Sequence, residues 1–503
     1  MTLFRSLLAR TLTGVLVLGT LAPLPALSQV PQAQPTQAPE AAMTPLPMPT
    51  SSGTPIPYPA YGTPAPDVAA QQPKSGYPAQ VTADQAVDIA VELSPAFASE
   101  RAAYRAIAAK YGAAKGALLP NVSASGDLIR SYGSNGNNLN NNGTGTGTGN
   151  FANGASTIIT TEDGKVSLSQ LIFDGGHTIA LLRSAQFGDV AGRDTLVREL
   201  QTLAFNVATA YYDLLEADAT VDADNSIVRE NETQEKYVQA QIRTGAAARS
   251  DLAAAQFSTA QARGALVTAQ GAVIAAQATF TTTLGLDADA QVNPQPLAAS
   301  PPETKLLAYP DAIKLALQLR PDYLAAAATV DSDFAALRAA KLARFPTITA
   351  NADSGTTRSF IQSPAAASGW SPSGSLGASI TLPIYDQGLT NYNIAAAASQ
   401  YDQARAALLQ TQQTVESNVR GALATLISAR AGIVQAKAEL QSAEVSYQAT
   451  EAQYRVGATT ITAIITAQAN LATAQRDYVA AIYTERLDDS NYTYSLGNAD
   501  LKL

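Results

Sequence analysis

Few side chains in this sequence could carry out chemistry together. Among 503 residues there is one histidine, His177, and no cysteine. A single imidazole without a thiolate cannot complete a usual zinc or iron site, and a chain without cysteine forms no disulfide. A Ser-His-Asp triad would have to use His177, and no glycine-rich phosphate loop is visible. We therefore expect no catalytic residue, no metal site and no cofactor.

Two aspartates stand where a strand-like stretch gives way to a helix. Asp174 is followed by Gly175 and Gly176, and Asp386 is followed after one residue by Gly388. A carboxylate at such a turn accepts hydrogen bonds from the free N–H groups of the helix and faces the positive end of its dipole. We interpret both sites as structural strand–helix turns, and we place His177 at the polar end of the first.

Very long helices must position these side chains. Proline is absent from residues 121–293 and 384–503, and within them residues 177–243 and 389–455 read as continuous helix. At 1.5 Å per residue, about 67 residues span roughly 100 Å, far more than a usual globular helix. Such lengths, with much alanine, are typical of a coiled coil or a helical barrel.

Each long helix is expected to reverse at a glycine. Gly245 and Gly457 follow the two helices, and glycine tolerates the left-handed conformation that often ends a helix. A second helix of about 38 residues then returns to Leu284 in the first half and to Leu496 in the second. The sequence therefore predicts two helical hairpins.

The second half of the chain repeats the first. Pro95 and Pro120 recur as Pro321 and Pro346, at a constant offset of 226 residues. Beyond the next loop the offset becomes 212 and stays constant to the end of the repeat. The difference falls in an Asn/Gly/Thr-rich loop of the first half, Ser131–Asn150, between two strand-like stretches; the membrane arrangement inferred below makes this loop extracellular. Constant offsets over such a length predict a tandem duplication.

Each half begins with a predicted helix and continues with two strand-like stretches. The helices, each of about 35 residues, are expected over Asp84–Leu118 and Asp311–Arg344, where the prolines that follow stop them. Ser375–Ile384 alternates most clearly, with one apolar and one wet face. Weaker alternation marks the other three strands, expected over residues 121–132, 165–173 and 346–358.

The N-terminus indicates secretion. Arg5 and Arg10 precede a short apolar run, and small residues before Gln29 offer a cleavage site, so residues 1–28 read as a signal peptide. Residues 29–80 are rich in proline and read as a disordered linker. No later segment is long and apolar enough for a transmembrane helix. The net charge of −9 argues against nucleic acid as a partner.

Four amphipathic strands limit how a secreted chain can enter a membrane. Unpaired strand edges in lipid cost several kcal/mol per polar group, and closed membrane barrels begin at about eight strands. Chains must therefore pool their strands. Two chains would reach the minimum with a filled interior, and three would give twelve strands and a lumen wide enough for solute. The alternative, a soluble periplasmic sandwich with attached helices, leaves the helix length unexplained.

Several motifs resemble one family, the TolC-like outer-membrane efflux proteins. Leu171–Gly176 reads LIFDGG, similar to the family's IFDGG element, and Leu382–Gly388 is its second-half counterpart. Ala208–Leu215 reads ATAYYDLL and resembles the AYYDLL helix, and the Arg-x-Gly turns at Arg243 and Arg455 match the family's hairpin tips. The resemblance covers residue 81 to the C-terminus. It implies an α+β membrane protein: a homotrimer with a 12-stranded outer-membrane β-barrel, four strands per chain, continued into a long periplasmic α-helical coiled-coil barrel.

The resemblance also implies partners at the hairpin tips. These are a periplasmic adaptor (a membrane fusion protein) and an inner-membrane transporter, besides the lipid of the outer membrane. The tip residues expected to contact the adaptor are Arg243, Gly245, Arg455 and Gly457.

A periplasmic gate is implied at the same place. Asp251 and Tyr454 match family residues at the closed mouth, and we expect a Tyr454–Asp251 hydrogen bond to act as a latch. Thr459 departs from the family pattern because it stands where an arginine is usual, and Arg249 could supply the missing charge. The alternative for Asp251 is an N-cap or a solvated charge.

These inferences combine into one expected function. We expect the outer-membrane exit duct of a tripartite efflux pump or a type I secretion system, with a large periplasmic portion and a passive channel gated at the helix tips. The rivals are a periplasmic coiled-coil adaptor without a pore, which the four strands argue against, and a secreted hydrolase, which would need a catalytic constellation. The expected domains are two repeats, 81–286 and 309–503, joined by a linker, 287–308.

Overall fold

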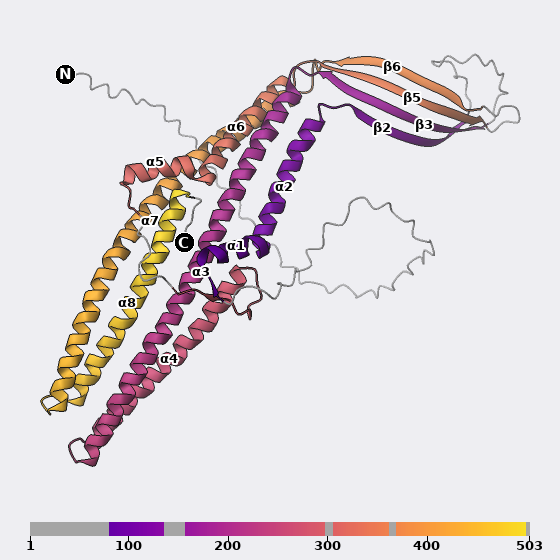
Figure 1. Ribbon diagram of the computed structural model, residues 1–503. Coiled ribbons are helices and arrows are strands. Elements are labelled where there is room, and N and C mark those ends of the chain that lie inside the picture. The colour runs from indigo at the N-terminus through magenta and orange to yellow at the C-terminus, as the bar shows by residue number, and fades with distance from the viewer. Residues whose placement is uncertain (1–79, 135–155, 297–304, 362–368, 499–503) are drawn as a thin grey trace, which may run out of the picture. The chain divides into compact units, whose positions relative to one another are not determined.

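The computed structural model describes residues 80–134, 156–296, 305–361 and 369–498 (Figure 1). The chain divides into two units, Met1–Gln71 and Gln72–Leu503, and all the described residues lie in the second. The predicted signal peptide, nearly all of the predicted linker and most of the predicted extracellular loop lie outside the described residues. Among the helices that are described, none combines the length and apolar character needed to cross a bilayer.

Each half opens with two helices rather than the single long helix that we predicted. They are α1 (Ala83–Leu93) and α2 (Pro95–Gly116) in the first half, and α5 (Tyr309–Leu319) and α6 (Pro321–Leu342) in the second. The breaks fall at Ser94 and Arg320, which both have extended backbone with ψ 118°. Each precedes a proline, whose ring disfavours helical geometry in the residue before it. The single-helix prediction was therefore wrong at both places.

The four predicted strands are present and pair in one antiparallel sheet. They are β2 (Asn121–Ser134), β3 (Ser156–Phe173), β5 (Thr347–Ile361) and β6 (Ser371–Thr381), and they pair in the order β2-β3-β5-β6. β6 ends before Ile384, its predicted end, because Pro383 has no N–H to donate to a ladder. A separate two-residue ladder pairs β1 (Gln80–Val81) with β4 (Asn293–Pro294) in parallel.

The register of the sheet separates an apolar face from a polar face. Residues that pair directly share a face, and the next row of pairs lies on the other. One row consists of Val122, Leu168, Ala352 and Leu376. The next consists of Ser123, Ser167, Asp353 and Ser375. The large side chains of the first row are exposed in the single chain, with Leu376 87% exposed.

The two long helices have the bounds that the sequence predicts. They are α3 (His177–Arg243) and α7 (Leu389–Arg455), each of 67 residues. The returning helices, α4 (Arg249–Thr283) and α8 (Ile461–Leu496), have 35 and 36 residues, slightly fewer than expected. Figure 1 shows α7 and α8 running side by side from the turn that joins them, and α3 and α4 doing the same.

The helices pack side by side in a layer, with α3 and α7 continuing along its length. Near the sheet the order of contacts is α2-α3-α6-α7, which matches the order of the strands. Beyond α1 and α5 the order becomes α4-α3-α8-α7. The largest apolar cluster packs α1 against α3 and α4, with Phe280 and Leu214 fully buried, and the second packs α5 against α7 and α8 around Tyr492. Burial of these side chains holds the layer together midway along the long helices.

Candidate functional site at the hairpin tips

The two hairpin turns have the same backbone geometry. Gly245 has φ 75° and Gly457 has φ 74°, the left-handed conformation predicted for both. After each glycine an alanine N–H donates to a carbonyl five residues earlier, from Ala246 to Gln241 and from Ala458 to Gln453, at 2.8 Å in both cases. No atom lies within 4 Å of a Cβ built on either glycine, so backbone conformation alone calls for glycine. Arg243 and Arg455 end the preceding helices and are exposed at the tips.

The first turns of the returning helices are capped differently. The Asp251 carboxylate accepts a hydrogen bond from the Ala248 N–H at 3.3 Å and another from the Ser250 hydroxyl. Asp251 thus caps the helix from its third position, whereas the N-cap position that we weighed as an alternative for it is held by Ala248. At the second tip the Thr460 hydroxyl accepts from the Ala463 N–H at 3.4 Å. Arg249 is exposed beside the first cap.

A small apolar cluster joins the two tips within one chain. Tyr454 packs edge-on against Tyr237, with 6.2 Å between ring centroids. The buried members of this group, which we call the tip cluster, are Val238, Ala255, Tyr454, Ile461 and Ile464. They come from all four hairpin helices. The tip cluster therefore connects the α3/α4 hairpin to the α7/α8 hairpin through side-chain packing.

The predicted latch hydrogen bond is not formed in this structure. The Tyr454 hydroxyl is buried and has no hydrogen-bond partner among the described residues, while Asp251 is engaged in its helix cap. Burial raises the pKa of Tyr454, and the negative charge of nearby Asp251 raises it further. The two side chains are therefore neighbours, but the contact that ties Tyr454 to its surroundings is made by its ring. Thr459, which follows Tyr454 closely in the sequence, is half-buried in the second turn.

A polar groove of about 420 Å³ lies between α3 and α7, on the sheet side of the tip cluster. Burial and the charge of Glu451 raise the pKa of Glu230 inside it, against the opposing effect of Arg229. Arg455 forms an ion pair with Glu451 one turn earlier. The groove thus presents charges of both signs. Its lining is Ser226, Arg229, Glu230, Thr233, Gln234, Tyr237, Tyr447, Glu451 and Arg455.

The strand–helix turns at the other end of α3 and α7 have the predicted caps. The Asp174 carboxylate accepts from the N–H groups of Gly176 at 2.9 Å and Thr178 at 2.6 Å. Burial acts to raise the Asp174 pKa, but these hydrogen bonds outweigh it and the pKa is lowered. A Cβ on Gly175 would collide with the Phe345 side chain, which explains the glycine. His177 Nδ1 lies 2.8 Å from the Ala339 carbonyl, at the turn where we placed it.

The second-half turn has the same pattern. The Asp386 carboxylate accepts from the N–H groups of Gly388 at 3.1 Å and Thr390 at 2.8 Å. The hydrogen bonds from Thr390 lower the pKa of Asp386. Gly388 has φ 86°, and Gln387 takes the left-handed conformation that Gly175 has in the first half. Both aspartates thus have the structural role predicted for them.

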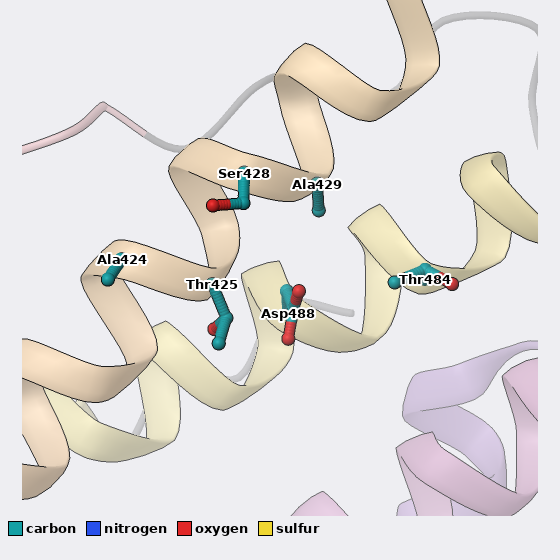
Figure 2. A pocket seen from close by; sticks show the side chains of 6 residues that line it. All are labelled: Ala424, Thr425, Ser428, Ala429, Thr484 and Asp488. Atoms are coloured by element: carbon teal, nitrogen blue, oxygen red, sulfur yellow. The ribbon is translucent and has the colours of Figure 1, made fainter. Parts of the chain in front are cut away.

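One small hollow between paired helices has a lining without a catalytic set of side chains. Figure 2 shows this hollow, of about 360 Å³, between α7 and α8, where Thr425 and Asp488 face each other among alanines. Burial raises the pKa of Asp488, and Thr425 opposes this shift. The lining contains one carboxyl group and no basic side chain, so we interpret the hollow as a packing gap between alanine-rich helices. Within the described ranges no His, Cys, Asp or Glu cluster could hold a metal ion.

Sequence reasoning missed most of the tip cluster. Tyr454 was identified, but Val238, Ala255, Ile461 and Ile464 were not. The pair Ile461 and Ile464 carried a usable signal, because two large apolar residues three apart follow the turn directly and share a helix face.

Comparisons with known proteins all point to one class. The outer membrane efflux protein family matches residues 86–286 and 312–490. The outer membrane efflux protein BepC of Brucella suis biovar 1 is 26% identical over 343 residues, which cover 68% of this chain and 72% of BepC. The fold is similar to that of the Campylobacter jejuni CmeC outer membrane channel, with a TM-score of 0.70 at 17% identity, covering 82% of this chain and 85% of CmeC. The Neisseria gonorrhoeae MtrE outer membrane channel, in its open state, gives a TM-score of 0.66 at 18% identity, covering 88% of this chain and 98% of MtrE.

Proposed function

The chain belongs to the outer membrane efflux protein family, and we propose that three copies of it form the exit duct of a tripartite efflux pump or a type I secretion system. Family membership confirms the predictions of an outer-membrane efflux channel and of a protein that is not an enzyme. The trimer, the closed barrel, the tandem origin of the two halves and the gate are the parts that we propose.

The amphipathic sheet is the observation that carries the proposal. In the described part of the chain β2 and β6 each have one neighbour, so the sheet has two open edges. Its apolar face can contact lipid and its polar face can contact water. The open edges, however, expose unpaired N–H and C=O groups, which are costly in lipid and make a single chain prone to pair with others. Pairing β2 of one copy with β6 of the next removes every edge. Three copies then close a 12-stranded barrel around a polar lumen.

The helical layer supports the same closure. The order of the helices follows the order of the strands, so the layer has matching edges along its length. Closing the sheet into a ring brings the α4 edge of one copy to the α7 edge of the next. The result is a helical tube that continues the lumen into the periplasm. A periplasmic adaptor without a pore would have no use for such a sheet.

We place the periplasmic gate at the tip cluster. The ring of Tyr454 lies within it, Asp251 is near enough to Tyr454 to affect its pKa, and Arg249 and Thr459 belong to the adjoining turns. Because the cluster is small and lies at the free end of both hairpins, little packing has to be lost when the tips part. We propose that the mouth opens by separation of the hairpins at this cluster, with the exposed Arg-x-Gly turns in contact with the adaptor.

The partners follow from this arrangement. We propose a periplasmic adaptor at the tips, an inner-membrane transporter beyond it, and outer-membrane lipid around the sheet. The duct is passive and needs no cofactor. Either small molecules or proteins could be its cargo.

Planar-bilayer recording tests the proposal. The protein, extracted from the outer membrane in detergent, should insert as a low-conductance channel that opens further when the adaptor is added. A preparation that inserts without conducting under either condition would contradict the proposal of an exit duct.

A further inference from the structure

The exposed side of α4 carries a regular apolar seam. Its large side chains, Phe257, Val267 and Ile274, are between 67% and 72% exposed, although α4 packs on α3 with its opposite side. Small residues fill the seam positions between them, Ala260 and Gly264 before Val267 and Gly271 after it, and are also exposed. The spacing of three and four residues is that of a coiled-coil a/d seam. An apolar stripe of this kind on a water-exposed helix indicates a missing partner.

The exposed side of α7 carries a second seam with the same spacing. Ile427, Val434 and Val445 are between 51% and 70% exposed. Exposed alanines, Ala424, Ala431 and Ala438, alternate with them. The face of α7 that packs within the chain is a different one, with Leu426 and Ala422 buried. Both edge helices of the layer thus present an unpartnered heptad face.

Cyclic symmetry fixes how high one seam stands against the other. In a ring with its axis along the helices, neighbouring copies are not displaced along that axis, so the two edges meet at equal height. Ser258 of α4 bonds to Asn231 of α3 at 2.6 Å, and Tyr237, further along α3, contacts Tyr454 of α7. Asn231 and Ser258 thus lie about six residues above Tyr237, and Tyr237 is level with Tyr454. Counting the same distance up α7 from Tyr454 places Ala260 within about one turn of the height of Val445.

We propose that α4 of one copy packs antiparallel against α7 of the next copy, in the register that sets Gly271 opposite Val434. The inference rests on the proposed trimer and names its helical contact. In this register a large apolar side chain meets a small one in four layers, as knobs meet holes. These layers pair Ala260 with Val445, Val267 with Ala438, Gly271 with Val434, and Ile274 with Ala431, and the remaining layer sets Gly264 opposite Gln441.

Charge and volume both select this register from its neighbours. Beside the seam, Arg263 of α4, which pairs with Glu232 of its own chain at 2.7 Å, comes opposite Glu444 of α7, so that the arginine lies between two carboxylates. Sliding α7 by four residues in one direction sets Val267 against Val434, and sliding it by three in the other sets Ile274 against Val434. Both shifts place two branched side chains in one layer, whereas the proposed register gives Val434 a glycine.

The glycines of the seam are not required by the single chain. A Cβ built on Gly264 or Gly271 meets no atom within 4 Å. Both have ordinary helical φ, and glycine is a poor helix former, so a larger residue at either position would favour the isolated helix. A role in contact with another copy explains why they are small.

Engineered disulfides test the register directly, because the chain has no cysteine of its own. Gly271→Cys combined with Val434→Cys should oxidise to dimers and closed covalent trimers on a non-reducing gel, since a disulfide needs Cβ atoms about 4 Å apart. Gly264→Cys combined with Val434→Cys, one heptad or about 10 Å out of register, should stay monomeric on the gel.

The failures are distinguishable. If the wild-type protein is trimeric by light scattering in detergent but the Gly271/Val434 pair does not cross-link, the inference is overturned and the proposed duct stands. If the wild-type protein is monomeric in detergent, the proposed function fails first.

Exchange of the knob and the hole gives an independent test. Gly271→Val should lower the trimer fraction at least tenfold on dilution, and the double variant with Val434→Gly should restore it. Gly432→Val on α7 is the matched control, because a Cβ on Gly432 also meets open space and Gly432 lies on the same helix as Val434 but off the seam. Trimers that withstand Gly271→Val as well as they withstand Gly432→Val would overturn the register.

Discussion

Removing one side chain from the tip cluster should open the periplasmic mouth. Ile464 is fully buried there, between helices of both hairpins. Truncation of a buried isoleucine to alanine costs about 2–5 kcal/mol, through lost transfer free energy and the cavity left behind. If about 3 kcal/mol of this cost destabilises only the closed state, in which the tips are in contact, Ile464→Ala raises the ratio of open to closed mouths roughly 100-fold. About 1.4 kcal/mol corresponds to a factor of ten in such a ratio.

Single-channel conductance in a planar bilayer measures this effect. Ile464→Ala and Tyr454→Ala should both raise the resting conductance towards that of the adaptor-opened channel. Tyr454→Phe is the matched control: it keeps the ring and removes a buried hydroxyl without a partner, so it should leave conductance unchanged and stability equal or higher by about 1 kcal/mol. Two results would refute the reasoning: a lower melting temperature with unchanged conductance for Ile464→Ala, or an opened channel for Tyr454→Phe, which would restore the hydroxyl latch.

Three further predictions concern the sheet, a cap and a turn. Leu376→Arg on the apolar face should cost about 2–4 kcal/mol if that face meets lipid and should abolish assembly in the outer membrane, whereas Ser375→Arg on the polar face should assemble; equal assembly of both would contradict a lipid-facing role. Asp174→Ala should lower the melting temperature at pH 7 by removing about 1 kcal/mol of capping. Because the Asp174 pKa is lowered in the folded state, its contribution is present above the ordinary value of 3.8 and disappears as pH falls below it, so the wild-type and variant melting curves should converge at acidic pH, and a constant gap would contradict the cap. Gly245→Ala should cost about 1 kcal/mol by thermal melting, from its positive φ alone, and a neutral result would mean that the turn relaxes.

The elements that the sequence predicted best are the helices whose start and end are both marked by characteristic residues. The bounds of α3 and α7 were correct because an aspartate–glycine turn starts each helix, a glycine ends it and no proline interrupts it. The break between α1 and α2 was missed although Pro95 is plain in the sequence. A proline in the first turn begins a helix as readily as it ends one, and periodicity on both sides of it does not distinguish the two cases.

The candidate site was predictable only in part, for a physical reason. Gly245 and Gly457 act through local backbone conformation, which the sequence encodes in a few neighbouring residues. The contact of Tyr237 with Tyr454 depends on how two hairpins meet across more than 200 residues of chain, which local patterns do not encode. The same holds for Asp251, whose carboxylate could serve a cap or a latch and is engaged in the cap.

The number of chains in the particle tests the central claim most directly. Light scattering of the protein extracted from outer membranes, corrected for bound detergent, should give three chains in one particle, because the open edges of β2 and β6 need two further copies to close a water-filled lumen. A single chain that remains in the aqueous periplasmic extract without detergent would contradict the account.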